Sequence, residues 1–250
     1  MVVGLEMFRD RFASYADQYV LIGGVACSLA LEDAGAQFRV TSDLDIVLCA
    51  EAQSPEFVAE FWKFVKDGDY EVQQKGDKKQ FFRFKKPKTE GYPRELELFS
   101  RLPDALEYEG TGPFTPVPID ADVSSLSAIL LDSGYYEFLQ KGKTTSQDLP
   151  TVGAVHLIPL KARAWLDMTE RKAKGDKIDS DKIKKHKLDV FRLYAIIDPE
   201  FQDEMPPQIK QDMQTFLDRM QSEEIDLKVA GLANQSKDEV LAAIRESYCH

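Results

Sequence analysis

Two stretches decide the fold that the sequence predicts, YVLIGGVACSLALEDAG (19–35) and FRVTSDLDIVLCA (38–50). The first opens with an apolar run of strand length that stops at Gly23-Gly24. Small and apolar residues at helical spacing follow, with Gly35 as the expected end of that helix. The second stretch is rich in β-branched and apolar residues and predicts another strand. The chain is therefore expected to begin with strand, glycine turn, helix and strand.

The rest of the chain divides into a mixed half and a helical half. Apolar residues at helical spacing predict a helix at 54–69, and alternating residues predict strands at 80–86 and 94–101. A helix is expected at 135–142, and GKTTSQDLP (142–150) is interpreted as a polar loop at the domain boundary. Four further helices are expected at 154–174, 179–197, 206–222 and 237–248. The predicted class is α+β, with an α/β-type domain at 1–150 and a helical domain at 151–250.

Composition limits the classes of function. The 250 residues carry a net charge of −11 with 43% hydrophobic content, which argues against broad, sequence-independent binding to nucleic acid. Basic residues nevertheless gather in two segments, 75–88 and 171–187. No apolar stretch approaches the roughly 20 residues that span a bilayer. Three cysteines without metal-ligand spacing fit a reducing compartment. We expect a cytoplasmic protein that does not enter a membrane.

An Asp-x-Asp pair on a strand offers two carboxylates on one face, a geometry that suits Mg²⁺ with phosphate oxygens and water completing its shell. The spacing alone is weak, because it occurs four times, at 43/45, 67/69, 120/122 and 179/181. Only Asp43 and Asp45 border a predicted strand. They also follow the glycine turn, whose backbone amides and helix dipole favour phosphate. A tight turn without a ligand is the alternative interpretation of Gly23-Gly24.

A third carboxylate on an adjacent strand would complete a two-metal site. Glu97 and Glu95 in RELELFSR (94–101) are the candidates, and both point to the same face by parity. Periodicity does not separate them. The alternative is an exposed, charged face of an edge strand.

The order of the glycine turn and the acidic pair resembles the signature of the nucleotidyltransferase superfamily, and more narrowly its AbiEii-like, toxin-like branch. That resemblance implies a polymerase β-like mixed sheet with helices. It assigns Gly23, Gly24 and Ser28 to the triphosphate of an NTP, and Asp43 and Asp45 to a divalent metal, Mg²⁺ or Mn²⁺.

The resemblance extends into the second half of the chain. ELELFSR is similar to the family strand that carries the third acid before a Leu-Phe pair, which selects Glu97 as a metal ligand. Lys161 matches the lysine of a hydrophobic-Lys motif that contacts NTP phosphates. Lys185 and Asp189 match a second basic motif. His186 stands where that motif usually has aspartate, so the role of that first acid is in doubt.

The residues of the helical half can also be interpreted from the sequence pattern alone, without the family resemblance. Lys161 interrupts an apolar stretch, and a lysine among apolar neighbours needs a partner, of which phosphate is one. Lys185, Asp189 and Arg192 share one helical stripe, for which an ordinary solvent-facing set of ion pairs is the alternative. His156, in an apolar run, is interpreted as structural.

These features predict an enzyme that moves a nucleotidyl group from an NTP to a hydroxyl acceptor with release of pyrophosphate. The resemblance implies a toxin-like enzyme with a cognate antitoxin-like partner. The acceptor stays open among RNA or tRNA, a small molecule and a protein hydroxyl. Two alternatives remain: a non-catalytic nucleotide-binding or interaction module with a degenerate nucleotidyltransferase fold, and an ordinary α/β protein in which the motifs coincide by chance.

Overall fold

A computed structural model describes residues 2–36, 43–48, 54–73, 81–99, 129 and 132–249, with only the backbone described for 43–48 and for residues 72, 73, 81, 82 and 99. The chain forms two compact units. The sheet unit comprises 1–33, 37–123 and 143–152, and the helical unit comprises 34–36, 124–142 and 153–250. The chain contains both a β-sheet and a set of α-helices, which confirms the coarse α+β class.

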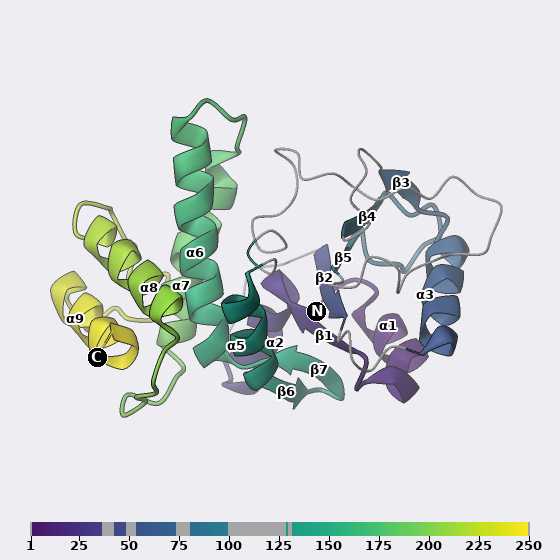
Figure 1. The fold of residues 1–250 in the computed structure, drawn as a ribbon, viewed down its shortest axis with the longest axis horizontal. Coiled ribbons are helices and arrows are strands. Elements are labelled where there is room, and N and C mark those ends of the chain that lie inside the picture. The colour runs from purple at the N-terminus through teal and green to yellow at the C-terminus, as the bar shows by residue number, and fades with distance from the viewer. Residues whose placement is uncertain are drawn as a thin grey trace. The chain divides into compact units, whose positions relative to one another are not determined.

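The sheet unit is built on a mixed seven-stranded sheet with the order β3-β4-β5-β2-β1-β7-β6 (Figure 1). β1 runs antiparallel to β2 and parallel to β7, while β2 runs parallel to β5. The strands are β1 (Tyr19–Ile22), β2 (Asp43–Leu48), β3 (Glu71–Gln73), β4 (Phe81–Lys85), β5 (Glu95–Phe99), β6 (Lys143–Ser146) and β7 (Leu149–Val152). Its helices are α1 (Leu5–Phe12), the short 3₁₀ turn Ala13–Tyr15, α2 (Gly23–Asp33) and α3 (Pro55–Asp67).

The local sequence explains the ends of these helices. α2 begins directly at Gly23, whose φ of 71° is one that glycine adopts without strain, and Gly35 follows its end with a φ of 72°. α3 begins with Ser54, whose side chain accepts a hydrogen bond from the Phe57 amide, followed by Pro55 at the first helical position. The predicted order of strand, glycine turn, helix and strand is confirmed.

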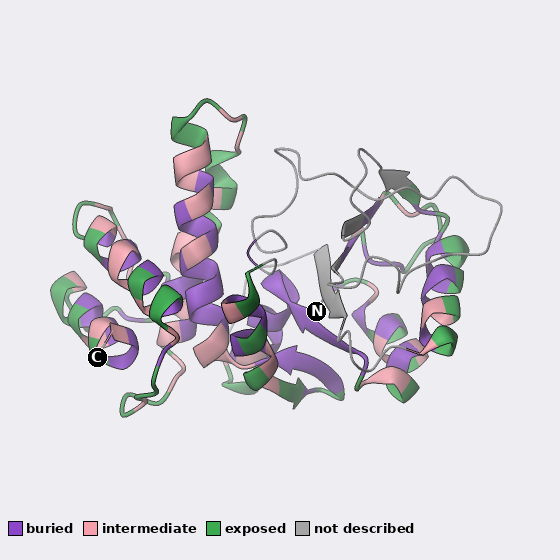
Figure 2. Cartoon of the chain, viewed as in Figure 1, coloured by how far each residue is buried: buried purple, intermediate pink, exposed green. Residues whose placement is uncertain are grey.

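One face of the sheet carries an aromatic core. The ring of Phe12 from α1 contacts those of Phe57 and Phe61 from α3 and that of Phe8, and Leu96 of β5 lies in the same cluster. All four residues of β1 and all four of β7 are also buried (Figure 2). Because side chains alternate along a strand, the core-facing residues of β4 and β5 alternate with charged ones on the opposite face.

The interpretation of 142–150 as a polar loop is wrong. Residues 143–152 form the hairpin of β6 and β7, and β7 pairs with β1 through Leu21 and Thr151. Gln147 and Asp148 turn the chain with φ values of 51° and 62°, as the two central residues of a type I′ turn do. The β-branched threonines of KTTS signalled a strand, but the absence of glycine in the turn concealed the hairpin. β3 was also missed, because it is only three residues long.

The helical unit contains the expected helices, with α5 at Ser133–Lys141, α6 at Ala154–Ala173, α7 at Ser180–Tyr194, α8 at Pro207–Met220 and α9 at Lys237–Cys249. Pro159 lies inside α6 and removes the amide that would bond the Val155 carbonyl. The Tyr248 hydroxyl from α9 donates to that carbonyl instead, at 3.0 Å. None of the described helices combines the length and apolar character needed to span a bilayer.

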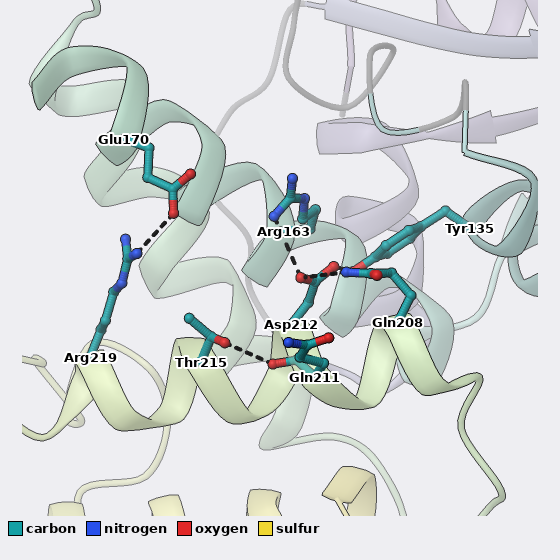
Figure 3. Close-up of polar contacts among 8 residues, drawn as sticks. All are labelled: Tyr135, Arg163, Glu170, Gln208, Gln211, Asp212, Thr215 and Arg219. Carbon is teal, nitrogen blue, oxygen red and sulfur yellow. Dashed lines mark hydrogen bonds and ion pairs between the residues drawn. The ribbon is translucent and has the colours of Figure 1, made fainter. Parts of the chain in front are cut away.

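A polar network ties three of these helices together (Figure 3). Asp212 of α8 accepts hydrogen bonds from the Tyr135 hydroxyl of α5 at 2.9 Å and from the Gln208 amide at 3.1 Å, and it pairs with Arg163 of α6 at 3.5 Å. Burial, with the Asp212 charge beside it, raises the pKa of Tyr135. The buried Asp212 carboxylate thus finds its hydrogen-bond and ion-pair partners within the helical unit, and we assign it a structural role.

The aromatic core predicts a large effect from a single truncation. Phe12 is fully buried and its ring contacts those of Phe8, Phe57, Phe61 and Phe64. Phe12→Ala is expected to lower the free energy of unfolding by about 3–5 kcal/mol because it leaves a cavity in this cluster. Urea denaturation measures the change, and Lys63→Ala on the exposed side of α3 should stay within about 0.5 kcal/mol. Equal values for the two variants would contradict the assigned core.

Candidate functional site

Strand register brings two of the three predicted metal ligands, Asp45 and Glu97, into one row of the sheet. Ile22 of β1 pairs with Asp45 of β2, Asp45 pairs with Glu97 of β5, and Glu97 pairs with Arg83 of β4. Adjacent strands lie about 4.8 Å apart, and residues paired across them share a face of the sheet. The row therefore joins the last residue before Gly23 to one acid of the Asp-x-Asp pair and to the predicted third acid.

A second row lies two residues along the strands. Asp43 pairs with Glu95, and Glu95 pairs with Lys85. The two rows form a block of four acidic positions on β2 and β5, flanked on the β4 side by Arg83 and Lys85. At their formal charges, the four acids carry two more negative charges than Arg83 and Lys85 offset.

The glycine turn adjoins this block. Ile22, paired with Asp45, is directly followed by Gly23, where the 11-residue α2 begins. Backbone amides at a helix N-terminus bind phosphate, and the helix dipole adds to that attraction. The strand ends on this side of the sheet therefore bring together Gly23 and Gly24, the backbone of the Asp-x-Asp pair and the start of β5. The side chains of Asp43 and Asp45 lie outside the described part of the structure.

Arg83 joins the two acids of β5. Its Nη2 atom lies 2.5 Å from Oε1 of Glu97, and its Nε atom lies 3.1 Å from Oε1 of Glu95. Lys85 pairs with the second oxygen of Glu95, with 3.6 Å between Nζ and Oε2. Arg83 and Glu97 are 6% and 8% exposed. The two acids that periodicity could not separate therefore differ, because both oxygens of Glu95 have a cationic neighbour.

The second oxygen of Glu97, Oε2, is buried and makes no hydrogen bond to any residue that the structure describes. A buried carboxylate oxygen without a partner is unfavourable by about 1–3 kcal/mol or more. Together with the unbalanced charge of the block, this atom fits a hard cation that binds carboxylate oxygen. Among the described side chains no group of three potential ligands converges, but Asp43 and Asp45 are not among them.

An open hollow of about 530 Å³ adjoins the second row. Glu95 and Lys85 belong both to that row and to the lining, which also includes Lys86, Arg94 and Tyr92. The lining carries three bases, Lys85, Lys86 and Arg94, and two acids, Glu90 and Glu95, and it lies beside the acidic block.

Ser28 lies further along α2, five residues from Gly23 and so about 7.5 Å along the helix axis. Its hydroxyl donates to Glu32 at 2.8 Å, and Gln147 donates to the second oxygen of Glu32 at 3.1 Å. Both contacts border a hollow of about 180 Å³ that Arg9 also lines. The contact of Ser28 with a triphosphate stays a prediction, and it requires the hydroxyl to leave Glu32.

Lys161 and Asp189 meet each other in the helical unit. The Lys161 ammonium donates to Oδ2 of Asp189 at 3.1 Å, and the side chains are 2% and 0% exposed. Arg192 approaches Oδ1 of Asp189 at 3.7 Å. The need of Lys161 for a partner is met by Asp189, and the alternative of a solvent-facing stripe is wrong for Asp189. A contact of Lys161 with phosphate stays a prediction that requires this pair to open.

The remaining candidates of the helical unit differ in exposure. Lys185 is exposed on α7, and His186 beside it is partly buried. The ring of His156 packs against Phe138 with 4.5 Å between the centroids, and burial lowers its pKa. This environment fits the structural role expected of His156.

Arg83 is the residue that sequence reasoning missed. Its signal was the alternation of charged and aromatic residues in FFRFK, which places Arg83 and Lys85 on one face of a strand. The antiparallel pairing of β4 with β5, which brings Arg83 to Glu97, could not be read from either strand alone.

The sequence matches no protein-family model and no curated protein. Any functional conclusion therefore depends on the geometry of this site and on its motifs.

Breaking the buried ion pair between Lys161 and Asp189 is expected to destabilise the helical unit. Asp189→Ala leaves the Lys161 ammonium buried without that carboxylate and should lower the free energy of unfolding by about 3–5 kcal/mol. Replacing both residues, as Lys161→Met with Asp189→Leu, should restore most of that loss, because an apolar pair of similar volume carries no desolvation penalty. Chemical denaturation measures the free energy of unfolding of the single and the double variant. A double variant as unstable as Asp189→Ala alone would contradict the explanation that the loss comes from an unpaired buried charge.

Proposed function

We propose that this protein is a metal-dependent nucleotidyltransferase with a polymerase β-like sheet, which moves a nucleotidyl group from an NTP to a hydroxyl acceptor. The observation that carries the proposal is the buried Oε2 of Glu97, which makes no hydrogen bond to a described residue and lies in the same sheet row as Asp45. Support also comes from the helix N-terminus at Gly23, one residue beyond the end of that row. The order of these elements along the chain is that of the family the sequence resembles.

In this proposal Asp43, Asp45 and Glu97 hold Mg²⁺ or Mn²⁺. When bound, such a cation neutralises charge on the phosphoryl oxygens and aligns the attacking and leaving oxygens. The acceptor oxygen forms a bond to the α-phosphorus, the bond to the β-phosphate oxygen breaks, and pyrophosphate leaves. A carboxylate of the Asp pair accepts the proton of the acceptor hydroxyl, which requires it within hydrogen-bond reach.

The phosphates of the NTP would lie against the amides at Gly23 and Gly24, where the positive end of the helix dipole favours anions. Ser28 is proposed as a further contact. Lys161 and Lys185 are proposed as phosphate contacts on the resemblance alone; Lys185 is exposed, whereas Lys161 is paired with Asp189. The hollow beside Glu95 offers space and cations for the remainder of the substrates.

The acceptor stays open among RNA, including tRNA, a small molecule and a protein hydroxyl, as does the toxin-like role with an antitoxin-like partner. Each of these acceptors presents a hydroxyl, and the acidic block does not distinguish between them. A non-catalytic module that only binds nucleotide is separated from an enzyme by pyrophosphate release.

The first test is binding of Mg²⁺-NTP, followed by pyrophosphate release with candidate acceptors. Asp45→Asn and Glu97→Gln are expected to weaken Mg²⁺-NTP binding at least tenfold, or about 1.4 kcal/mol, because each removes a metal-binding oxygen. Isothermal titration calorimetry across ATP, GTP, CTP and UTP measures the affinity.

A matched control is available in a second Asp-x-Asp pair. Asp67→Asn/Asp69→Asn changes two carboxylates at the end of α3, where Asp67 pairs with Arg11 at 2.8 Å and Asp69 pairs with Lys88 at 3.1 Å. This double variant should bind Mg²⁺-NTP as the wild type does. If Asp45→Asn binds Mg²⁺-NTP with the wild-type affinity, the assignment of Asp45 to the metal is wrong. Binding with no pyrophosphate from any acceptor would favour the non-catalytic module.

A further inference from the structure

Arg83 restricts how Glu97 can meet a cation. One carboxylate oxygen of Glu97, Oε1, lies 2.5 Å from the Arg83 guanidinium, and only Oε2 is left without a partner among the described residues. Arg83 is also held by Oε1 of Glu95, at 3.1 Å from its Nε atom. A planar guanidinium bonded at two of its edges has a fixed orientation, so the Glu97 carboxylate is fixed as well.

A carboxylate that offers a single oxygen favours some cations over others. Mg²⁺ requires near-ideal octahedral geometry with short bonds and usually takes one oxygen from each carboxylate. Ca²⁺ takes six to eight oxygens and commonly accepts both oxygens of one carboxylate. Because Oε1 of Glu97 points to Arg83, bidentate coordination of a cation by Glu97 requires that ion pair to break.

We infer that Arg83 is a specificity-determining residue, which keeps Glu97 monodentate and thereby selects a small octahedral cation over Ca²⁺. The inference rests on the proposed function, since it assigns Glu97 to the metal. Arg83 itself touches no metal or substrate and acts by positioning Glu97.

Lysine could not replace Arg83 in this role. The guanidinium contacts Glu95 and Glu97 through two different nitrogen atoms, Nε and Nη2. A lysine ammonium is a point charge on a flexible stem and does not reproduce that fork. Lys85 offers a matched comparison, because it lies on the same strand and pairs with Glu95 at 3.6 Å. Lys85→Met therefore removes one positive charge from the same face while Arg83 and Glu97 stay paired.

The test measures the affinities of Mn²⁺ and Ca²⁺ separately, by calorimetry on the full chain, in wild type, Arg83→Met, Arg83→Lys and Lys85→Met. Circular dichroism and thermal unfolding verify that each variant is folded. The ratio of the Ca²⁺ Kd to the Mn²⁺ Kd is the decisive quantity, since general loosening of the site weakens both ions together. In Arg83→Met and Arg83→Lys this ratio should fall by about tenfold, a typical effect of a residue that orients a metal ligand.

In Lys85→Met the ratio should stay within about twofold of wild type, because the charge is lost without freeing Glu97. A ratio that is unchanged in Arg83→Lys, or that falls equally in Lys85→Met, overturns the inference while the metal site stands. If Arg83→Met does not fold, Arg83→Lys alone decides, since it retains the charge. Wild type that binds neither ion, with or without an NTP, contradicts the proposed function itself.

Discussion

The structure of the candidate site depends on the ion pair between Arg83 and Glu97. Like charges directly opposite each other on adjacent strands are destabilising, and the register of β2 with β5 creates two such pairs. Arg83 and Lys85 offset the charge on the β4 side. Oε2 of Glu97 makes no hydrogen bond to a described residue, and the side chains of β2 lie outside the described part of the structure. The aromatic core on the other face supplies the stability that lets the sheet tolerate this charge.

Two buried ionic clusters among the described residues differ in how their charges are paired. Lys161 and Asp189 are almost fully buried, but they meet each other, and Arg192 lies near the second carboxylate oxygen. Both oxygens of Asp189 thus have a cationic neighbour. Glu97 is nearly as buried; its Oε1 lies 2.5 Å from Nη2 of Arg83, and its Oε2 makes no hydrogen bond to a described residue. We therefore propose the cation at Glu97 rather than at Asp189.

Much of the fold could be predicted because it depends on local patterns. The helix at α2 follows from a glycine pair before small apolar residues, and α3 follows from aromatic spacing with Ser54 and Pro55 at its start. The β6–β7 hairpin was missed because Gln147 and Asp148 adopt positive φ without glycine. Its pairing with β1, more than 120 residues earlier in the sequence, also leaves no local signal.

The candidate site shows the same division. Parity placed Glu95 and Glu97 on one face, and the resemblance of ELELFSR to the family strand selected Glu97. Only the pairing of β4 with β5 shows how Arg83 and Lys85 contact these acids. The partner of Lys161 was likewise beyond the sequence, because Asp189 lies on another helix, 28 residues away. Patterns within one element could be read, whereas contacts between elements required the fold.

The central claim is that the acidic block of β2 and β5 binds a divalent cation through Glu97. Anomalous scattering from crystals grown with Mn²⁺ and an NTP tests it most directly. The account predicts an anomalous peak about 2.1 Å from Oε2 of Glu97, with an Asp45 oxygen in the same coordination shell and Oε1 still paired with Arg83. A peak elsewhere, or none beside Glu97 when the NTP is bound, would contradict it.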